Sequence, residues 1–274
     1  MLERFQLTGK NAIVTGASGT IGGAMAEALA RAGANVAMCY HSNSEPIEKA
    51  IRELSPLGVT LRGYKIDCMQ REQIAEHADK VMEDFGSIDI VVNTAGGLLP
   101  GSVSDNGLTL FDLDLDIMEK MVTYNLFAGC IWPCFFYSKK MIPNPEGGSI
   151  INIASMNSYR PLEGRASYAA AKAGVANFTQ WLAVHLAKDL NPKIRVNAIA
   201  PGFFPSKQNW ESMASQTGEL GWRGKKIIER TPMGRLGVPD DLLGTLIWYA
   251  SDASKYVTGT MTPVDGGFTA YAGL

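Results

Sequence analysis

The sequence predicts an α/β protein with a doubly wound, Rossmann-type fold of three layers, in which helices cover both faces of a mainly parallel seven-stranded sheet. Three observations support this prediction. Short, β-branched apolar segments alternate with longer amphipathic segments along the chain. A glycine-rich turn follows the first apolar segment, and polar residues follow several of the others. The 274 residues are 46% hydrophobic, which suits a single domain over residues 1–274.

The secondary-structure elements follow from hydrophobic periodicity and from the residues that interrupt it. Apolar runs predict strands over residues 11–15, 35–40, 59–66, 88–92, 149–154, 194–200 and 260–264. Helical patterns lie over residues 24–32, 44–54, 70–85, 116–141, 166–190 and 239–250. Gly33 and Gly86 end two of these helices, as glycine commonly does. Pro133 leaves the Gly129 carbonyl without its usual donor, so we expect a bend there.

The composition excludes several classes of function. A net charge of −2 without charge blocks does not suit a nucleic-acid partner or an anionic membrane. No apolar run is long enough to span a bilayer, and residues 1–10 lack the apolar core of a secretory signal. The cysteines form no CxxC pair, so we expect reduced thiols in a cytoplasmic protein and no metal site. They are Cys39, Cys68, Cys130 and Cys134.

A glycine-rich turn between the first strand and the first helix predicts a phosphate-binding site. Glycines allow the backbone to approach a pyrophosphate, and the helix N-terminus attracts its negative charge. Such a turn is weak evidence alone, but its place between a strand and a helix favours dinucleotide binding. The residues expected to contact the cofactor here are Gly16, Ser18, Gly19, Thr20, Ile21 and Gly22.

Polar residues at the carboxyl ends of the strands predict further cofactor contacts, because ligands bind at this edge of a doubly wound sheet. Each has an alternative role as a turn or cap residue, and His41 suits a solvated loop equally well. No carboxylate follows the second strand to bind a ribose 2′-hydroxyl, and no Arg is present for a 2′-phosphate. The choice between NAD and NADP stays open, with a slight lean to NADP. The candidates are Tyr40, His41, Ser42, Asp67, Cys68, Asn93, Ala95, Gly96, Pro201 and Gly202.

Three residues around the fifth strand predict acid/base chemistry. Ser155 stands at the end of the strand, while Tyr168 and Lys172 share one face of the following helix. An ammonium about 4 Å from a phenol, at a dielectric near 20, favours the phenolate by roughly 4 kcal/mol, or about three pKa units. We therefore expect Lys172 to lower the pKa of Tyr168 toward neutrality. The alternative is a packed tyrosine beside a lysine that extends to solvent.

Aromatic residues of the later chain carry two expectations. Trp181 should face the core from its helix, together with Leu182 and Leu186. Residues 203–232 are polar and interrupted by glycine, which predicts a lid over the substrate or, alternatively, a plain surface excursion. The aromatic residues expected to be exposed in this segment are Phe203, Phe204, Trp210 and Trp222.

The chain resembles the short-chain dehydrogenase/reductase family over nearly its whole length. The matching motifs are Thr15-Gly16-Ala17-Ser18-Gly19-Thr20-Ile21-Gly22, Asp67, Asn93-Thr94-Ala95-Gly96, Asn125, Ser155, Tyr168-x-x-x-Lys172, Pro201-Gly202 and Asp265-Gly266-Gly267. The resemblance implies an NAD(P)H-dependent oxidoreductase and a homotetramer.

The resemblance also implies individual roles. Ser155 binds the substrate oxygen, Tyr168 transfers the proton, Lys172 binds the nicotinamide ribose, and Asn125 holds a water that connects Lys172 to solvent. Two positions depart from the family pattern. The family usually has Gly or Ala at Thr20, and its NADP-preferring members often have a basic residue at Gly19, which weakens the lean to NADP. Asn-Thr-Ala-Gly in place of Asn-Asn-Ala-Gly is a mild change.

Within the family, several stretches look like the D-mannonate oxidoreductase (fructuronate reductase) branch. They are 155–162, 177–185, 198–204 and 231–235. A sugar acid needs a cation for its carboxylate and polar groups for its hydroxyls. The candidates are Asn157, Arg160, Gln208 and Asn209. A surface salt bridge is the alternative for Arg160.

Three hypotheses follow for the function. The first is an oxidoreductase that interconverts D-fructuronate and D-mannonate. The second is a related enzyme, such as a gluconate 5-dehydrogenase or a 3-oxoacyl-carrier-protein reductase, although no basic cluster for an acidic carrier is evident. The third is a dinucleotide-binding sensor without catalysis, which would have no need of the Tyr168 hydroxyl.

Overall fold

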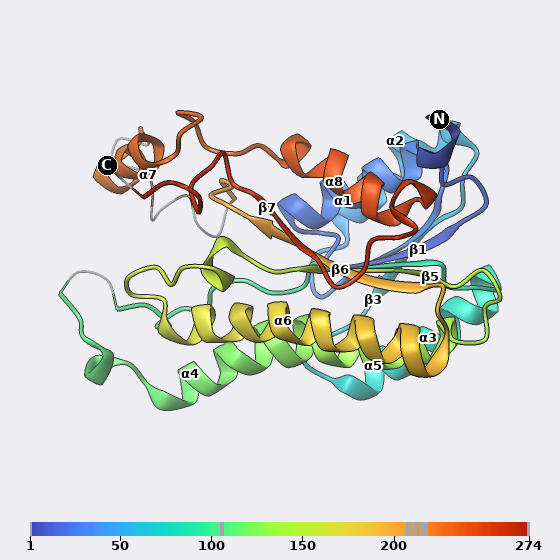
Figure 1. Cartoon of the computed structure of the whole chain (residues 1–274), viewed down its shortest axis with the longest axis horizontal. Helices are drawn as coiled ribbons and strands as arrows, with labels where there is room; N and C mark the ends of the chain where they lie inside the picture. Colours follow the sequence, from blue (N-terminus) through green and yellow to red (C-terminus); the bar gives the residue numbers. More distant parts are fainter. Residues whose placement is uncertain (1, 105–106, 207–209, 211–212, 214–218, 273–274) are drawn as a thin grey trace.

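A parallel sheet of seven strands forms the centre of the computed structural model (Figure 1). The structure describes residues 2–104, 107–206, 210, 213 and 219–272. The strand order is β3-β2-β1-β4-β5-β6-β7, and every neighbouring pair is parallel. The strands are β1 Asn11–Thr15, β2 Asn35–Tyr40, β3 Leu61–Lys65, β4 Ile90–Asn93, β5 Gly148–Ile153, β6 Ile194–Pro201 and β7 Met261–Val264. The predicted fold class is confirmed.

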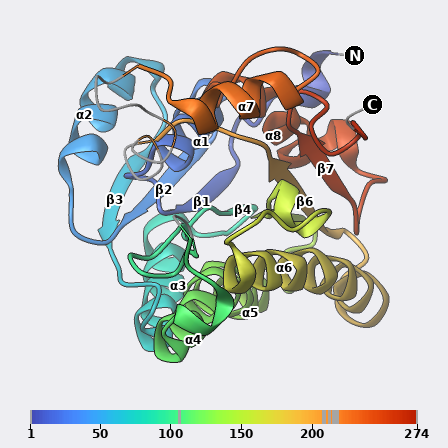
Figure 2. The same ribbon diagram turned by 90° about the vertical axis from the view of Figure 1, so that its left-hand side faces the viewer.

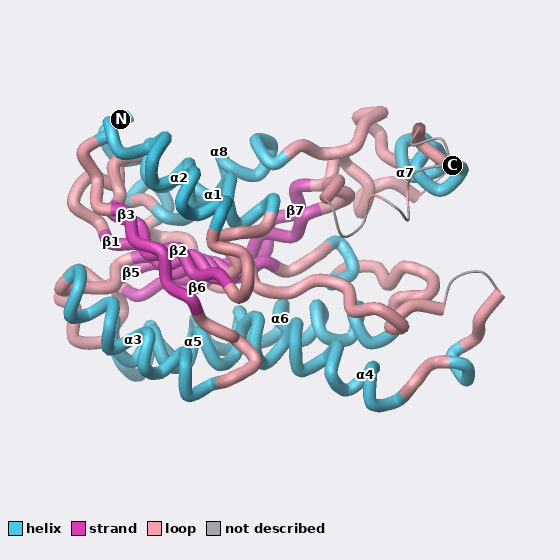
Figure 3. Tube along the Cα trace, turned by 180° about the vertical axis from the view of Figure 1, so that it is seen from behind, coloured by secondary structure: helices cyan, strands magenta, loops and turns pink. Residues whose placement is uncertain are grey.

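Helices cover both faces of this sheet. One face carries α1 (Thr20–Arg31), α2 (Glu45–Leu54) and α8 (Leu243–Ala250), and the other carries α3 (Arg71–Phe85), α5 (Trp132–Met141) and α6 (Ala166–His185). Figure 3 shows the same two helical layers from behind. The chain order reverses between β1 and β4, which are neighbours in the sheet although β2 and β3 lie between them in sequence. In doubly wound folds this reversal marks the place where ligands bind.

Two apolar cores hold the layers together, one on each face of the sheet. The β-branched and aliphatic strand residues are buried on both faces, as parallel strands between helices require. Ile13 and Val91 face the layer of α3, α5 and α6, whereas Val14 and Val92 face the layer of α1, α2 and α8. All four side chains are fully buried. The alternation along each strand therefore divides the core into two halves.

The helix predicted over residues 116–141 changes its hydrogen bonding before Pro133. It begins as α4 (Leu115–Val122), continues as a π-helical segment over Thr123–Ile131, and ends as α5. The Trp132 N–H donates to the Phe127 carbonyl, five residues back. A wider turn of this kind takes up the loss of a donor at Pro133. The hydrogen-bond pattern therefore changes before Pro133, whereas the bend expected there stays a prediction.

Two expectations about the later chain are wrong, and one helix was not predicted. Trp181 has 58% of its side chain exposed instead of facing the core, whereas Leu182 and Leu186 are buried as predicted. Phe204 is buried, because its ring packs against Gly237 at a point where no side chain intervenes. Residues 222–230 form α7 (Trp222–Arg230), which sequence analysis did not predict within the polar segment.

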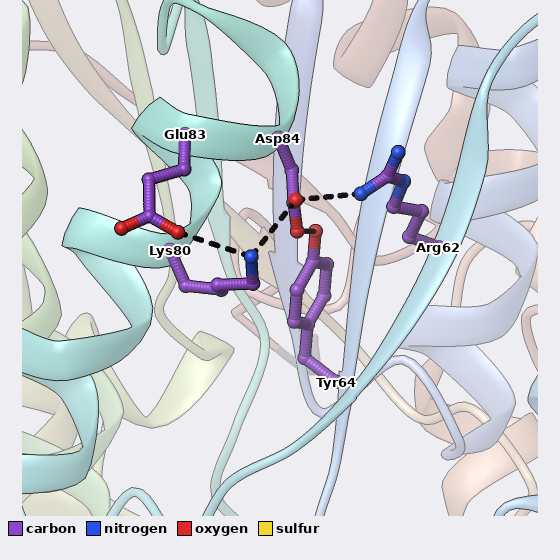
Figure 4. A network of polar contacts seen from close by, with 5 residues as sticks. All are labelled: Arg62, Tyr64, Lys80, Glu83 and Asp84. Atoms are coloured by element: carbon purple, nitrogen blue, oxygen red, sulfur yellow. Dashed lines mark hydrogen bonds and ion pairs between the residues drawn. The ribbon is translucent and has the colours of Figure 1, made fainter.

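A network of charged and phenolic side chains joins β3, at the edge of the sheet, to α3 (Figure 4). Asp84 accepts a hydrogen bond of 2.7 Å from the Tyr64 hydroxyl and pairs with Arg62 at 2.6 Å and Lys80 at 3.1 Å. These donors lower the pKa of Asp84 to about 2. This network joins the edge strand β3 to α3.

Within the described part of the chain, no helix combines the length and apolar character needed to cross a bilayer. The same residues contain no group of three or more His, Cys, Asp or Glu side chains arranged to hold a metal ion.

Candidate active site

The loops that leave the carboxyl ends of the strands gather on one side of the molecule, which Figure 2 faces. The glycine-rich turn after β1, the loops after β4 and β5, and the segment after β6 all lie there. The α7 helix lies toward the same side, near the C-terminal segment (Figure 1). The fold therefore brings residues that are distant in sequence to a single edge of the sheet.

The glycine-rich turn leads into α1 with an exposed N-terminus. Gly16 has φ of +64°, a backbone region that favours glycine. A Cβ at Gly22 would lie 2.6 Å from the Thr94 hydroxyl and against the Gly16 carbonyl. Gly19 caps α1 without any side-chain hydrogen bond, so no side chain covers the first amides of the helix. A helix N-terminus without a side-chain cap suits a phosphate group, and pyrophosphate binding at this turn stays a prediction.

Two threonines connect this turn to the loop after β4. The Thr15 hydroxyl accepts hydrogen bonds from the backbone N–H groups of Thr94, at 3.1 Å, and Ala95, at 3.2 Å. The Thr94 hydroxyl donates a short hydrogen bond to the Thr15 carbonyl. Sequence analysis treated Thr94 as a mild variation and gave it no role. The only feature of the sequence that pointed to Thr94 was its hydroxyl, at a position where the family usually has a second asparagine.

The loops after β2 and β3 bring His41 near Asp67. The two side chains approach to 3.9 Å, and His41 is largely exposed. Asp67 also accepts a hydrogen bond from the Met69 N–H at 2.9 Å, while its own N–H donates to Gln73. Asp67 is thus a half-buried turn residue, and its contact with a cofactor stays a prediction. Burial raises the pKa of the neighbouring Cys68 thiol to about 12, which keeps it protonated.

The loop after β4 is fixed by Asn125 from the π-helical segment. The Asn125 amide donates to the Gly97 carbonyl and accepts from the Gly97 N–H, each at 2.9 Å. Gly96 has φ of +142°, and a Cβ there would lie 2.8 Å from the Asn125 oxygen and 3.8 Å from the Lys172 ammonium. The predicted residues Asn125, Gly96 and Lys172 therefore meet at one place. Ala95 lies beside them, half-buried.

Asn93 differs from the expectation of a side-chain cofactor contact. It is 1% exposed, and its amide donates to Asn152 at 2.9 Å and to the Cys134 sulfur at 3.3 Å. The side chain therefore connects β4 to β5 and α5 inside the sheet. The carboxamide oxygen of Asn93 is buried without a hydrogen-bond partner in the described part of the chain, and a cofactor contact at this residue stays a prediction.

Ser155, Tyr168 and Lys172 lie together at the end of β5. Ser155 is 5% exposed and extended, and Tyr168 hydrogen-bonds with its hydroxyl. The Lys172 ammonium lies 5.7 Å from the centroid of the Tyr168 ring, so the two residues share one face of α6 as predicted. Lys172 is 5% exposed and donates to the Ile153 carbonyl at 2.8 Å. It is therefore directed into the site and not into bulk water.

The expected effect of Lys172 on the phenol is wrong for this structure. Burial raises the pKa of Tyr168, and the hydrogen bond with Ser155 lowers it by less. The Lys172 ammonium is directed to the Ile153 carbonyl, and burial lowers the pKa of Lys172 itself to about 8. The phenol is consequently neutral at physiological pH in this structure.

The predicted substrate residues separate into three groups. Asn157 is 6% exposed and contacts Ser155. The Arg160 guanidinium is exposed and donates to the Tyr271 carbonyl at 3.2 Å. Gln208 and Asn209 lie outside the described residues. Sequence analysis missed Arg165, a 4% exposed guanidinium just before α6 that donates to the Gly164 carbonyl.

The end of β6 faces the C-terminal segment. Pro201 is buried, and the Gly202 N–H donates to the Val264 carbonyl at 3.0 Å. A Cβ at Gly202 would lie 2.7 Å from Asp265, which itself caps the turn that follows β7 through the Thr269 N–H. Pro201 and Gly202 thus pack closely against the end of β7, directly before the segment 203–232.

Comparisons with known proteins agree with this arrangement. A family model described as enoyl-(acyl carrier protein) reductase matches residues 16–269. The chain is 38% identical to the oxidoreductase UxuB of Bacillus subtilis, and the match covers 98% of both chains. A candidate D-mannonate oxidoreductase from Haemophilus influenzae, solved with bound NAD, has a TM-score of 0.90 at 38% identity and 98% coverage of both chains.

A third similar structure is described as a candidate gluconate 5-dehydrogenase from Beutenbergia cavernae with bound NADP at low occupancy. It has a TM-score of 0.84 and 30% identity, with 98% of this chain and 100% of that chain covered. The relatives therefore differ both in the sugar acid of their names and in the dinucleotide that they hold.

Proposed function

The chain belongs to the short-chain dehydrogenase/reductase family, and from that premise we propose that it interconverts a keto sugar acid and its alcohol, most specifically D-fructuronate and D-mannonate. Family membership makes it an NAD(P)-dependent oxidoreductase that acts on CH–OH groups. The observation that carries the proposal is the meeting of Ser155, Tyr168 and Lys172 at the end of β5. Lys172 lies beside Gly96 in the loop after β4, which hydrogen-bonds to Thr15 at the start of the glycine-rich turn.

Each residue at the end of β5 has a proposed role. When bound, NAD(P)H supplies the hydride to the carbonyl carbon. The Ser155 hydroxyl donates a hydrogen bond to the substrate oxygen, and Tyr168 gives its proton to that oxygen as negative charge develops there. Lys172 holds the nicotinamide ribose, and Asn125 holds a water that links Lys172 to solvent. In the direction of alcohol oxidation, the same groups take the proton back.

The protonation states of Tyr168 and Lys172 in the ligand-free site support reduction of a carbonyl group as the favoured direction. Burial keeps the Tyr168 phenol protonated, which is the form that a general acid needs. The Lys172 pKa of about 8 leaves most of its ammonium charged at neutral pH. A dinucleotide that brings Lys172 closer to the phenol would then favour the phenolate after proton transfer.

The substrate carboxylate is the part of the proposal that most needs a cation. Arg160 is exposed on the loop that follows Ser155, and we propose that its guanidinium pairs with the carboxylate while Gln208 and Asn209 contact hydroxyls. We also propose that residues 203–232 act as the lid of the single domain. The slight lean to NADP rests on the loop directly after β2, which itself contains no carboxylate and has a largely exposed His41, although Asp67 from the loop after β3 lies 3.9 Å from that imidazole.

The substrate is tested by purified enzyme and a panel of sugar acids and neutral ketones, each with NADH and NADPH. D-Fructuronate should give the highest kcat/KM, and NADPH should be used at least as well as NADH. A highest value for 5-ketogluconate would favour a gluconate 5-dehydrogenase, the second candidate, which the Beutenbergia cavernae relative supports. A highest value for an acyl-carrier substrate would refute both.

Tyr168→Phe separates catalysis from binding. We expect turnover to fall by about 10³-fold or more, because the acid/base group is removed. Dinucleotide affinity, measured by fluorescence titration, should change by less than about threefold, since the ring remains. If the Tyr168→Phe variant kept its turnover, that result would contradict an enzymatic role for Tyr168 and would favour a dinucleotide-binding sensor.

We further propose that the protein is a cytoplasmic homotetramer. Four large apolar side chains are 40–63% exposed along α5, α6 and the preceding π-helical segment, and a second copy would cover them. They are Phe127, Phe135, Trp181 and Val184. The four free cysteines support a reducing compartment.

The assembly can be measured by analytical ultracentrifugation. Phe135→Asp should convert the tetramer into smaller species, because a charge would be buried at the contact. Tyr256→Asp is a matched control, since Tyr256 is fully exposed between α8 and β7. A wild-type protein that sediments as a monomer would refute the proposal.

A further inference from the structure

The orientation of the Asn157 side chain is determined by its neighbours. Its carboxamide oxygen accepts a hydrogen bond of 2.9 Å from the Leu162 N–H, which can only donate. The carboxamide nitrogen must therefore face the opposite side, where the Ser155 hydroxyl lies 3.3 Å away. The backbone N–H of Asn157 also donates to that hydroxyl, at 3.1 Å.

This arrangement decides how Ser155 can use its hydroxyl. A hydroxyl group has one hydrogen to donate and two lone pairs that accept. At Ser155 both acceptor positions are taken by N–H groups of Asn157. The oxygen and its two donors are buried, with Ser155 5% and Asn157 6% exposed, so water has little access. The single hydroxyl hydrogen is left to donate to Tyr168 in the free protein, or to the substrate oxygen when a substrate is bound.

We propose that Asn157 is a positioning residue, which acts through Ser155 by keeping its hydroxyl as a hydrogen-bond donor toward the reacting oxygen. The proposal rests on the proposed function, in which Ser155 binds the substrate oxygen. It replaces the expectation that Asn157 touches the substrate, because both polar atoms of the carboxamide are already engaged within the chain.

The Asn157 side chain also links Ser155 to the loop that leads into α6. Leu162 lies in the segment between the short 3-10 helix Met156–Ser158 and α6, and its N–H is held by Asn157. One side chain therefore fixes the donor at the end of β5 and the loop that leads to Tyr168. The hydrogen bond from Ser155 also lowers the pKa of Tyr168. Loss of this hydrogen bond should raise that pKa, and Lys172 is the charged group beside the phenol in both cases.

The test uses Asn157→Asp and Asn157→Ala in the full-length enzyme. An aspartate keeps the bond from Leu162 but accepts the Ser155 hydrogen instead of donating to its oxygen. We expect kcat with the best substrate of the panel to fall roughly 100-fold in Asn157→Asp, with KM changed less than about threefold. The apparent pKa in the kcat profile should rise. Phenol ionisation in the dinucleotide-free protein, measured by near-ultraviolet difference titration against Tyr168→Phe, should move in the same direction.

A matched control distinguishes positioning from general stability. Asn197 is fully buried in β6. Its carboxamide donates to the Val257 carbonyl and accepts from the N–H and the hydroxyl of Thr260, so it is held at both polar atoms, as Asn157 is. Asn197→Ala should lower the unfolding midpoint without moving the pH profile or the phenol titration. A profile that moves equally in both variants would overturn the proposal.

A double-mutant cycle with Ser155→Ala completes the test. If Asn157 acts through Ser155, then Asn157→Ala should lower kcat in the wild type but change it less than about twofold in Ser155→Ala. An equal loss in both backgrounds, or a rise in KM with kcat unchanged, would overturn the positioning role. If Ser155→Ala itself keeps full kcat, the proposed function fails, while the phenol titration still decides whether Asn157 controls the Ser155 hydrogen.

Discussion

Thr94 determines how the glycine-rich turn meets the loop after β4. Its hydroxyl donates to the Thr15 carbonyl and lies where a Cβ at Gly22 would stand. The Thr15 hydroxyl returns two hydrogen bonds by accepting from the backbone of this loop. Because Thr15 is fully buried, its hydrogen-bonding groups are costly to leave without partners. The geometry of the glycine-rich turn therefore depends on Thr94, a residue for which we propose no direct contact with the dinucleotide.

Thr94→Val should weaken dinucleotide binding. The valine has the shape of threonine but leaves the Thr15 carbonyl without its donor, at a cost of about 1–3 kcal/mol. We expect the Kd for NADH, from fluorescence titration, to rise about tenfold, which corresponds to about 1.4 kcal/mol. Thr94→Ser keeps the hydroxyl and should bind within about twofold of the wild type. If serine weakens binding as much as valine, the hydroxyl is not the cause.

At the scale of single residues, the sequence predicts which groups meet but not their charge. The four-residue spacing of Tyr168 and Lys172 requires a shared helix face, and the structure has one. The sign of the Tyr168 shift could not be predicted in this way. It depends on burial and on the Ile153 carbonyl, which competes with the phenol for the ammonium. The Asn157 contact to Ser155 depends equally on a local turn that spacing does not reveal.

The C-terminal segment after β7 packs across elements that form the predicted substrate side. The Phe268 ring lies edge-on to Phe203 with centroids 5.1 Å apart, and the Met233 N–H donates to the Gly266 carbonyl at 3.1 Å. Arg160 reaches the same segment through the Tyr271 carbonyl. Arg160 consequently has two possible effects, on a bound carboxylate and on the order of the last residues.

Arg160→Ala separates these effects. A hydrogen-bonded charge pair contributes about 1.5–3 kcal/mol, so the apparent KM for a uronate should rise roughly 10- to 100-fold. The KM for a neutral ketone should change less than about twofold. Equal changes for both substrates, together with faster proteolysis near the C-terminus, would remove Arg160 from the carboxylate site and leave it as a brace for the segment. Arg160→Lys keeps the charge and should recover part of the uronate affinity.

At the scale of elements, the strands were predictable because buried parallel strands are continuous apolar runs. The predicted ranges 11–15 and 35–40 coincide with β1 and β2. The helix α7 was not predictable from apolar periodicity, since only Gly224 and Ile227 of its nine residues are buried. Trp181 was misplaced for a related reason. A large aromatic residue on a helix indicates burial, but it cannot indicate whether the burial occurs within one chain or against a second copy.

For the whole molecule, the sheet order follows from rules that act on any βα repeat. Right-handed crossovers and one reversal after β3 lead to the order observed here. The polar contacts inside the resulting layers do not follow from those rules. The clearest case is His77 of α3, which is 4% exposed in the layer beneath β2. Its ring contacts Tyr137 through a hydrogen bond of 2.9 Å, the Cys39 sulfur at 3.6 Å and the Tyr64 ring with centroids 4.7 Å apart.

His77 should make the stability of the whole protein sensitive to acid. Burial lowers its pKa to about 4 from the ordinary value of 6.5, and the nearby Asp84 opposes this only weakly. The neutral ring is therefore stabilised by folding, so this contribution is complete above pH 6.5 and is lost as the pH falls through about 4. The shift corresponds to about 3 kcal/mol. Urea unfolding of wild type should show a loss of that size between pH 7 and 4, whereas His77→Gln, which cannot take up a proton, should lose much less over the same interval. An identical pH dependence in the two proteins would show that the buried imidazole is not the group that acid titrates.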